Sequence, residues 1–221
     1  MAIDNTGKEK LNGTSQSVLA TAPVDYSRQY QDLLNNQLRL YFTQIDGFTA
    51  AMLNTSGARY LSAPAGAFFS TATQTAANTT TAYPITFNNS DTSNLGVTVV
   101  SNTRLTVEFA GRYNLQFSAQ LENTTNASVD IDIWFRKNGD TSTIANSNSR
   151  FGLAARKGVG DPYHTVGTVN LFIDLQAEDY VELVWCTTDI GADIRAYTAG
   201  SSPTRPAIPS VIATMSYVSR L

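Results

Sequence analysis

A narrow stripe of apolar residues repeats along residues 34–48. Its members are separated by four, three, four and three positions, and this spacing places them on one side of a helix in the pattern of a coiled-coil seam. The stripe is formed by Leu34, Leu38, Tyr41, Ile45 and Phe48. The opposite face is polar, with Asn35, Asn36, Arg39 and Thr43. The pattern predicts a short helix, residues 25–48, whose stripe packs against a partner.

The ends of this helix are suggested by Asp25, a suitable N-cap residue, and by Gly47, which weakens a helix. The same seam holds polar Ser27 and Gln31 upstream, so its apolar part covers only about two heptads, too few for a stable isolated coiled coil. The helix is therefore expected to be held by its own head or by whatever it docks into. The narrow stripe favours self-association.

Beyond Gly66 the pattern changes to period two. Leu105, Val107 and Phe109 alternate with polar side chains, as expected for half-buried strands. Similar signals lie at residues 67–70, 83–87, 97–100, 113–117, 129–135, 169–175, 181–186, 194–197 and 211–218. About ten short strands separated by turn signals predict a mainly β head, a sandwich or jelly roll, over residues 66–221, after a linker at 49–65.

Residues 1–24 are polar and rich in Ser, Thr, Asn and Gly. They have too little apolar content to form a core of their own. We interpret them as an arm that docks onto another protein, the alternative being a tail that rests on its own subunit.

Charge limits the classes of partner. Only 15% of the 221 residues are charged and the net charge is −3, so the chain lacks the basic field that non-specific nucleic-acid binding needs. Residues 1–21 lack the apolar core of a signal peptide, and no later run is long enough to span a membrane. We expect no nucleic-acid partner and no membrane insertion. Release as part of a virus particle would explain an extracellular location.

Residues that support catalysis or metal binding are scarce. Cys186 is the only cysteine and His164 the only histidine, so an internal disulfide is impossible and a zinc site would need several carboxylates. There is no GxSxG motif, and the Gly158 and Gly160 pair lacks the other elements of a phosphate loop. Cys186 lies in an apolar run, which predicts a buried, inert thiol. We expect no cofactor and no metal.

Asp130 and Asp132 alternate with Val129, Ile131 and Ile133, so both carboxylates point to the same polar face of one strand. In an oligomer such a face could line an axis and bind Ca²⁺. Two solvated acids are the simpler interpretation. A glycoside hydrolase also uses two carboxylates, but across a cleft, and alternate positions on one strand give no sign of a cleft.

Two segments are predicted to be surface loops. Residues 149–164 combine positive charge with Gly and Pro, and their candidate ligand-contacting residues are Arg150, Arg156, Lys157 and His164. The bound group would be a host polysaccharide or protein, and the alternative is a solvated loop or a contact between subunits. Residues 200–209 are rich in Pro and Ser and precede the last strand.

Several sequence segments in the predicted strands resemble those of a known family. They are Gly111-Arg112-Tyr113-Asn114-Leu115-Gln116-Phe117, Trp134-Phe135-Arg136-Lys137-Asn138-Gly139, Glu178-Asp179-Tyr180-Val181-Glu182-Leu183 and residues 209–218. In order and spacing they resemble C1q/TNF-like jelly rolls, and more closely the versions in structural proteins of tailed bacteriophages, cyanophages among them. The predicted helix contains the segment Asn36-Gln37-Leu38-Arg39-Leu40-Tyr41-Phe42, which resembles the N-terminal region of such phage proteins. The resemblance covers residues 32–221.

The resemblance implies a ten-stranded jelly roll, a tight homotrimer with apolar residues on the shared axis, and a role without catalysis. One departure is Glu178, where many relatives have Gly before the following Asp. No calcium-binding cluster can be carried over residue by residue. The heptad seam and this resemblance together predict a trimeric protein on the virion surface, a short fibre or tail appendage that docks onto other virion proteins through residues 1–24.

Three other functions stay open. A capsid cement or decoration protein would need no host ligand, and the short chain favours it. A particle-borne polysaccharide depolymerase is a lesser alternative. A cellular C1q-like lectin is disfavoured by the lack of a signal peptide and of disulfides.

Overall fold

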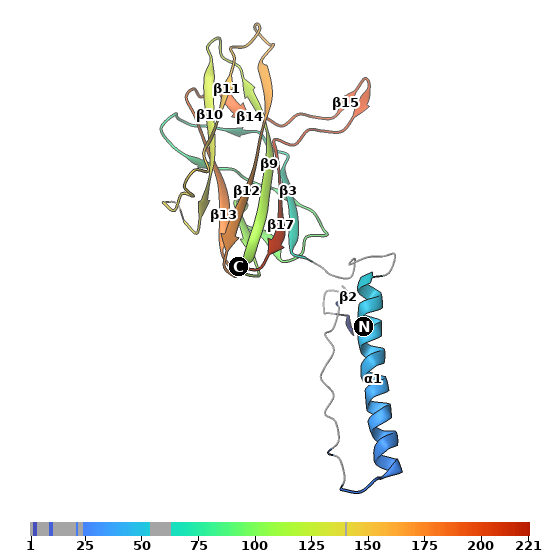
Figure 1. Cartoon of the computed structure of the whole chain (residues 1–221). Coiled ribbons are helices and arrows are strands. Elements are labelled where there is room, and N and C mark those ends of the chain that lie inside the picture. The colour runs from blue at the N-terminus through green and yellow to red at the C-terminus, as the bar shows by residue number, and fades with distance from the viewer. Residues whose placement is uncertain (1, 4–8, 11–20, 22–23, 54–62, 140) are drawn as a thin grey trace. The chain divides into compact units, whose positions relative to one another are not determined.

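The computed structural model describes residues 2–3, 9–10, 21, 24–53, 63–139 and 141–221. The chain divides into two compact units, Met1–Ser62 and Ala63–Leu221. The first holds one long helix and the second holds a β head (Figure 1). Each unit is described by itself.

Helix α1 spans Arg28–Leu53, and both of its ends differ from the prediction. Ser27, not Asp25, caps it, because the Tyr30 N–H donates to Ser27 Oγ at 3.3 Å. The helix also continues through Gly47 and beyond Phe48. A glycine inside a helix costs only about 1 kcal/mol, and the residues that follow include two alanines, Met52 and Leu53, which favour helix. Residues 49–53 therefore belong to the helix and not to the linker.

Little of the predicted N-terminal arm is described. Strands β1 (Ala2–Ile3) and β2 (Glu9–Lys10) pair in antiparallel fashion. Most of residues 1–24, like residues 54–62 of the predicted linker, lies outside the described residues. The docking role of the arm stays a prediction.

The head consists of two antiparallel sheets, which confirms the mainly β prediction. The six-stranded sheet has the order β11 (Ser149–Leu153), β10 (Val129–Lys137), β13 (Tyr180–Thr187), β8 (Arg104–Val107) and β7 (Val97–Val100), with β5 (Tyr83–Pro84) also paired to β13. Its strands carry the alternating apolar positions found in the sequence.

The seven-stranded sheet is organised around one long central strand, β9 (Gly111–Asn123). One edge of β9 pairs along its whole length with β12 (Tyr163–Leu175). The other edge pairs with β17 (Val211–Ser219) and then with β14 (Ala192–Ile194). Beyond these lie β3 (Ala65–Ser70), β6 (Asn89–Ser90) and β4 (Gln74–Thr75).

The hydrophobic core lies between the two sheets. On β9 the odd-numbered side chains Tyr113, Leu115 and Phe117 are buried, so its even-numbered side chains point outward. Phe117 meets Phe135 of the six-stranded sheet edge-on, with ring centroids 5.8 Å apart. Truncating such a ring to alanine typically costs 3–5 kcal/mol. This packing fixes the orientation of both outer faces.

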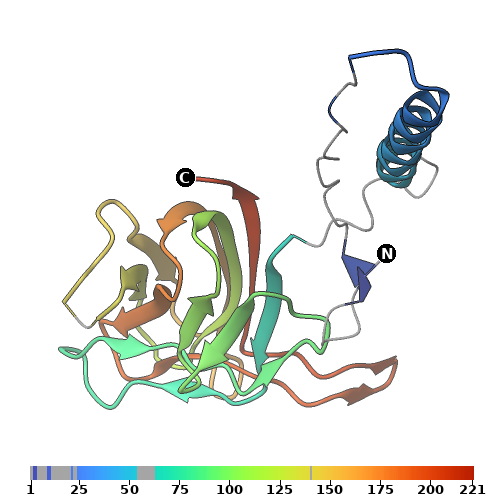
Figure 2. The same ribbon diagram turned by 90° about the horizontal axis from the view of Figure 1, so that it is seen from below.

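Both segments predicted as loops contain strands. Residues 149–164 include β11 and the start of β12, so only residues 154–162 form a loop there. The alternation in β11 is obscured by Ser149, Arg150 and Gly152, which are not typical strand residues. Residues 200–209 contain the hairpin of β15 (Gly200–Ser201) and β16 (Thr204–Arg205), which projects from the head (Figures 1 and 2).

The departure at Glu178 has a backbone consequence. Glu178 lies in the turn between β12 and β13 with a φ of 65°, a left-handed conformation that glycine adopts without penalty. Its N–H donates to the Val107 carbonyl at 2.8 Å. The turn thus keeps a glycine-like geometry although its residue carries a side chain.

Candidate functional site

The outward side of the seven-stranded sheet is free of charge over most of its length. Strand register places Phe172 beside Asn114, and Ser118 beside both Thr168 and Ile212. We call this surface the uncharged face. It consists of Val166, Thr168, Asn170 and Phe172 on β12, Asn114, Gln116, Ser118 and Gln120 on β9, and Ile212, Thr214 and Ser216 on β17.

Large apolar side chains are exposed on the uncharged face. The exposed fractions are 59% for Phe172, 51% for Val166 and 43% for Ile212. Asn114 Oδ1, next to Phe172 in the register, is buried and has no hydrogen-bond partner among the described residues. Exposed apolar groups beside an unsatisfied amide are unfavourable in water. The face therefore presents three large apolar side chains to the outside.

One end of the uncharged face is closed by an ion pair. Arg112 donates to both carboxylate oxygens of Asp174, at 2.7 Å from Nε and 2.9 Å from Nη2. The hydrogen bond from Arg112 lowers the pKa of Asp174 below its ordinary value. These two charges are matched within one chain and need no outside partner.

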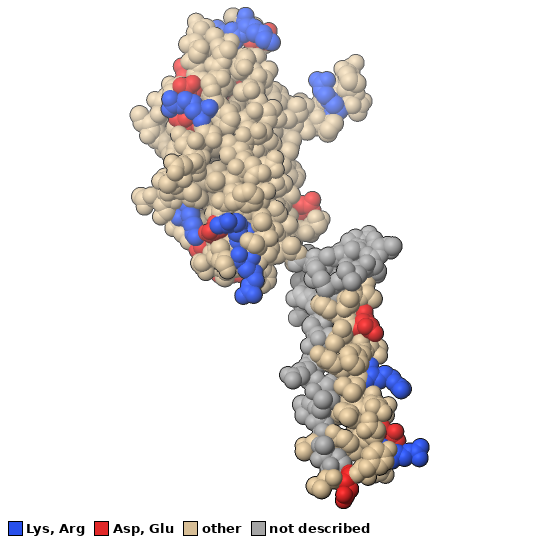
Figure 3. All heavy atoms as spheres, in the orientation of Figure 1, with Lys and Arg blue, Asp and Glu red and all other residues tan. Residues whose placement is uncertain are grey.

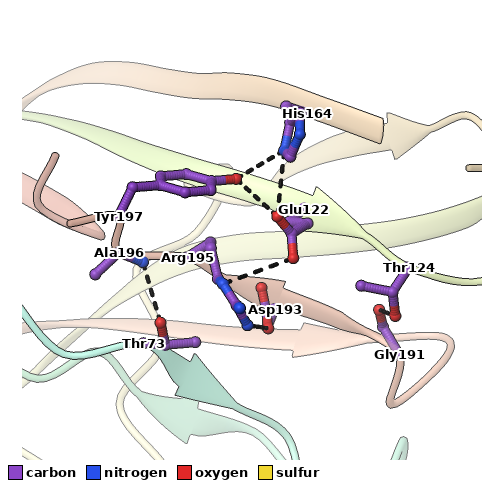
Figure 4. Close-up of polar contacts among 9 residues, drawn as sticks. All are labelled: Thr73, Glu122, Thr124, His164, Gly191, Asp193, Arg195, Ala196 and Tyr197. Carbon is purple, nitrogen blue, oxygen red and sulfur yellow. Dashed lines mark hydrogen bonds and ion pairs between the residues drawn. The ribbon is translucent and has the colours of Figure 1, made fainter. Parts of the chain in front are cut away.

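The other end carries a buried polar cluster (Figure 4). Glu122 on β9 and Asp193 on β14 are register neighbours, and both are buried. Arg195 lies between them, with Nε 3.7 Å from Glu122 Oε1 and Nη1 3.2 Å from Asp193 Oδ2. Asp193 Oδ1 has no partner among the described residues. Burial, and next the charge of Glu122, raises the pKa of Asp193 above its ordinary value.

Tyr197 and His164 complete the polar cluster. The Tyr197 hydroxyl donates to Glu122 Oε2 at 2.7 Å and lies 2.7 Å from His164 Nδ1. His164 Nδ1 also lies 3.3 Å from Glu122 Oε2. Burial and the bond to Glu122 raise the pKa of Tyr197 far above its ordinary value. Glu122 is thus contacted by Arg195, Tyr197 and His164, and the first two tie the segment after β14 to β9.

Arg150 lies on the outer side of the six-stranded sheet. It donates to both oxygens of Asp132, at 2.9 Å from Nε and 2.8 Å from Nη2, and its Nη1 lies 3.9 Å from Asp130 Oδ2. The two carboxylates do share a face, as their alternation predicts. The guanidinium holds the position that a cation would need between them.

The four candidate ligand-contacting residues are not brought together. Arg156 binds the loop after β9, donating from Nη1 to the Thr124 carbonyl at 3.2 Å. The backbone N–H of Lys157 donates to the Asp161 carbonyl at 3.0 Å. His164 lies on β12 in the polar cluster, and Arg150 lies on the other sheet. A contact with a host ligand stays a prediction for each.

Sequence reasoning missed Glu122, Asp193, Arg195 and Tyr197. Only the pairing of β9 with β14 brings these residues together, and pairing between distant strands leaves no local signal. Cys186 was expected to be buried, yet it is half-buried and lies beside Asp132 on the outer side of its sheet. Burial, the largest influence on it, raises the pKa of its thiol.

In helix α1 the structure places the predicted seam on one side. Leu34, Leu38, Tyr41, Ile45 and Phe48 are all half-buried, whereas Leu33, Leu40 and Phe42 are exposed. Charged side chains of the helix gather on one side in Figure 3. The helix has the asymmetry that a packed seam needs. Packing against other copies stays a prediction.

Among the described residues, no group of three or more His, Cys, Asp or Glu side chains could hold a metal ion. No helix in the described part of the chain has the length and apolar character to span a membrane.

Comparison with known proteins gives likenesses to solved structures alone. No family model matches the chain, and no curated protein matches it. The chain is similar to the globular domain of zebrafish complement 1qA protein, with 15% sequence identity and a TM-score of 0.44, over 72% of this chain and 100% of that one.

Proposed function

We propose that this chain is a non-enzymatic structural protein that assembles into a homotrimer through the uncharged face and the α1 seam. The observation that carries the proposal is the exposure of Phe172, Val166 and Ile212 between two ends whose charged residues contact one another within the chain. Three copies would bury these side chains around a shared axis. The seam of α1 would do the same for the stalk.

The uncharged face alone is smaller than a typical interface. It covers seven residues on each of β9 and β12, 114–120 and 166–172, so with β17 it is about 23 Å long and 15 Å wide, roughly 350 Å². A specific interface buries about 800 Å² per partner. The face supplies less than half of that area, so further elements would contribute.

The most specific form of the proposal is a virion surface protein of a tailed bacteriophage. The resemblance of the strand and helix segments to such proteins supports it. The long helix favours a short fibre or tail appendage. Residues 1–24 would dock onto other virion proteins. Three copies of each exposed loop, including Arg156 and Lys157, would give avidity for a host polysaccharide or protein.

A substitution in the seam tests the stalk. Leu38→Asp introduces a carboxylate into the half-buried seam, and Leu40→Asp, the matched control, introduces one on the exposed side of the same helix. In native mass spectrometry of the full chain, we expect Leu38→Asp to weaken the trimer at least 10-fold and Leu40→Asp to change it little. Equal behaviour of the two variants would contradict a seam between copies.

A capsid cement or decoration protein is the second candidate, and the short chain favours it. Cryo-electron microscopy of intact particles separates the two. Density at the tail vertex would make the protein a fibre, and density at every three-fold or quasi-three-fold position of the capsid would make it a decoration protein. Particles without it would contradict a virion role.

A further inference from the structure

The hairpin of β15 and β16 is the most isolated element of the head. We call residues 198–207 the hairpin arm. Every residue from Ser201 to Ala207 is exposed. In both views the arm extends well beyond the two sheets, on the side away from β10 and β11 (Figures 1 and 2).

The arm has little support within its own chain. Its hairpin is held by two register pairs, Gly200 with Arg205 and Ser201 with Thr204. In the described part of the chain, no other strand pairs with β15 or β16. A two-stranded hairpin alone is marginally stable in water. Both of its edges also present backbone groups that a neighbouring chain could use.

The base of the arm, in contrast, is firmly held. Tyr197 and Ile208 exchange two backbone hydrogen bonds of 2.9 Å. Before the arm, the Tyr197 hydroxyl is fixed in the polar cluster, and the Ala196 N–H donates to Thr73 Oγ1 at 3.1 Å. After it, the Ser210 N–H donates to the Ser70 carbonyl at 2.8 Å. The polar cluster therefore helps to set the direction in which the arm leaves the head.

The arm starts at the border of the uncharged face. It connects β14 to β17, and both strands pair with the same edge of β9. Asp193 lies in the outward row just before the arm, and Ile212 lies in the outward row just after it. If copies of the chain pack through the uncharged face, each arm leaves its head at the margin of that interface.

The composition of the arm suits contact with a largely uncharged protein surface. Arg205 is its only charged residue, and Pro203 and Pro206 restrict the backbone. A Cβ on Gly200 would lie 2.8 Å from Arg205 Cγ, so the glycine lets the arginine side chain cross the hairpin. A restricted, mostly uncharged arm loses less entropy on binding than a flexible loop.

We propose that the hairpin arm clasps a second copy of this chain, each arm lying on the head of the next subunit. The proposal rests on the trimer proposed above and supplies interface area that the uncharged face lacks. The partner is a second copy because the arm leaves from the margin of the face through which copies would meet.

Photo-crosslinking tests the clasp. Thr204, at the exposed tip, is replaced by p-benzoylphenylalanine, and full-length chains carrying it are mixed and reassembled with ¹⁵N-labelled chains that lack it. We expect crosslinks from the arm of one chain to head peptides of the labelled chain. The matched control carries the same group at Val159, which is 91% exposed in the 154–162 loop, and should give few crosslinks between chains.

Sedimentation of the same samples separates the two proposals. A trimer whose arm crosslinks only within its own chain, or not at all, would overturn the clasp and leave the trimer intact. A monomer would overturn both. Deleting Gly200–Arg205 gives a second test, because the base held by Tyr197 and Ile208 is retained. We expect the deletion to raise the dissociation constant of the trimer at least 10-fold with little change in melting temperature, and an unchanged constant would contradict the clasp.

Discussion

The two sheets enclose the same core, but charged residues are distributed differently on their outer faces. On the six-stranded sheet, charged residues of facing strands are matched, as with Arg150 and Asp132 at 2.8 Å or Arg136 and Glu182 at 2.9 Å. On the seven-stranded sheet, charges are confined to the two ends, and the uncharged face between them exposes Phe172 and Val166.

This difference indicates which face has its charged groups paired within one chain and which face leaves apolar groups exposed. A carboxylate that already accepts from an arginine gains little from a new partner. Exposed apolar side chains gain by being covered, because removing apolar area from water is favourable. We therefore assign self-assembly to the uncharged face and stability of the single head to the charge-matched face.

The largest expected effect comes from placing charge on the uncharged face. Phe172→Asp combined with Val166→Asp would bring six carboxylates together in a trimer, and buried unpaired charge is strongly unfavourable. We expect the dissociation constant to rise more than 100-fold, as measured by sedimentation velocity, with the head still folded by circular dichroism. Val159→Asp, outside this face, should leave the constant unchanged. A double variant that remains a trimer would contradict the assignment.

A smaller effect is expected on the charge-matched face, and on stability instead of assembly. Glu182 is buried and accepts from Arg136 and from Thr103 Oγ1 at 2.6 Å. Glu182→Ala removes the carboxylate that faces the buried Arg136 guanidinium, so urea unfolding should show a loss of about 3 kcal/mol. The exposed pair is the control, since Asp174→Ala should destabilise the head far less. If Glu182→Ala made the trimer dissociate under native conditions, the charge-matched face would also serve assembly, which would contradict the assignment.

The smallest effect concerns the polar cluster and depends on pH. Burial raises the pKa of Asp193 in the folded head, so the folded state loses stability as the pH rises through that pKa. Asp193→Asn removes the buried charge and should stabilise the head by about 1 kcal/mol at pH 7. The difference in melting temperature between the two proteins should shrink below the ordinary aspartate pKa of 3.8. Destabilisation at pH 7 would mean that the bond to Arg195 outweighs the burial.

Local patterns predicted the elements that follow one period. Alternation indicated β8, β9, β10 and β12, and the heptad spacing indicated a helix around Leu38. They missed β11, where Arg150 and Gly152 interrupt the strand signal, and the hairpin arm, whose Pro and Ser residues are typical of loops. The polar cluster was beyond local reasoning because Glu122 and Asp193 meet only through strand pairing.

The mass of the full chain in solution shows directly whether three copies associate. Sedimentation equilibrium at micromolar concentration should give about 72 kDa, three times the 23.9 kDa of one chain. That result would agree with three copies sharing the uncharged face. A mass of one chain at the same concentration, with the head folded, would contradict the proposed trimer.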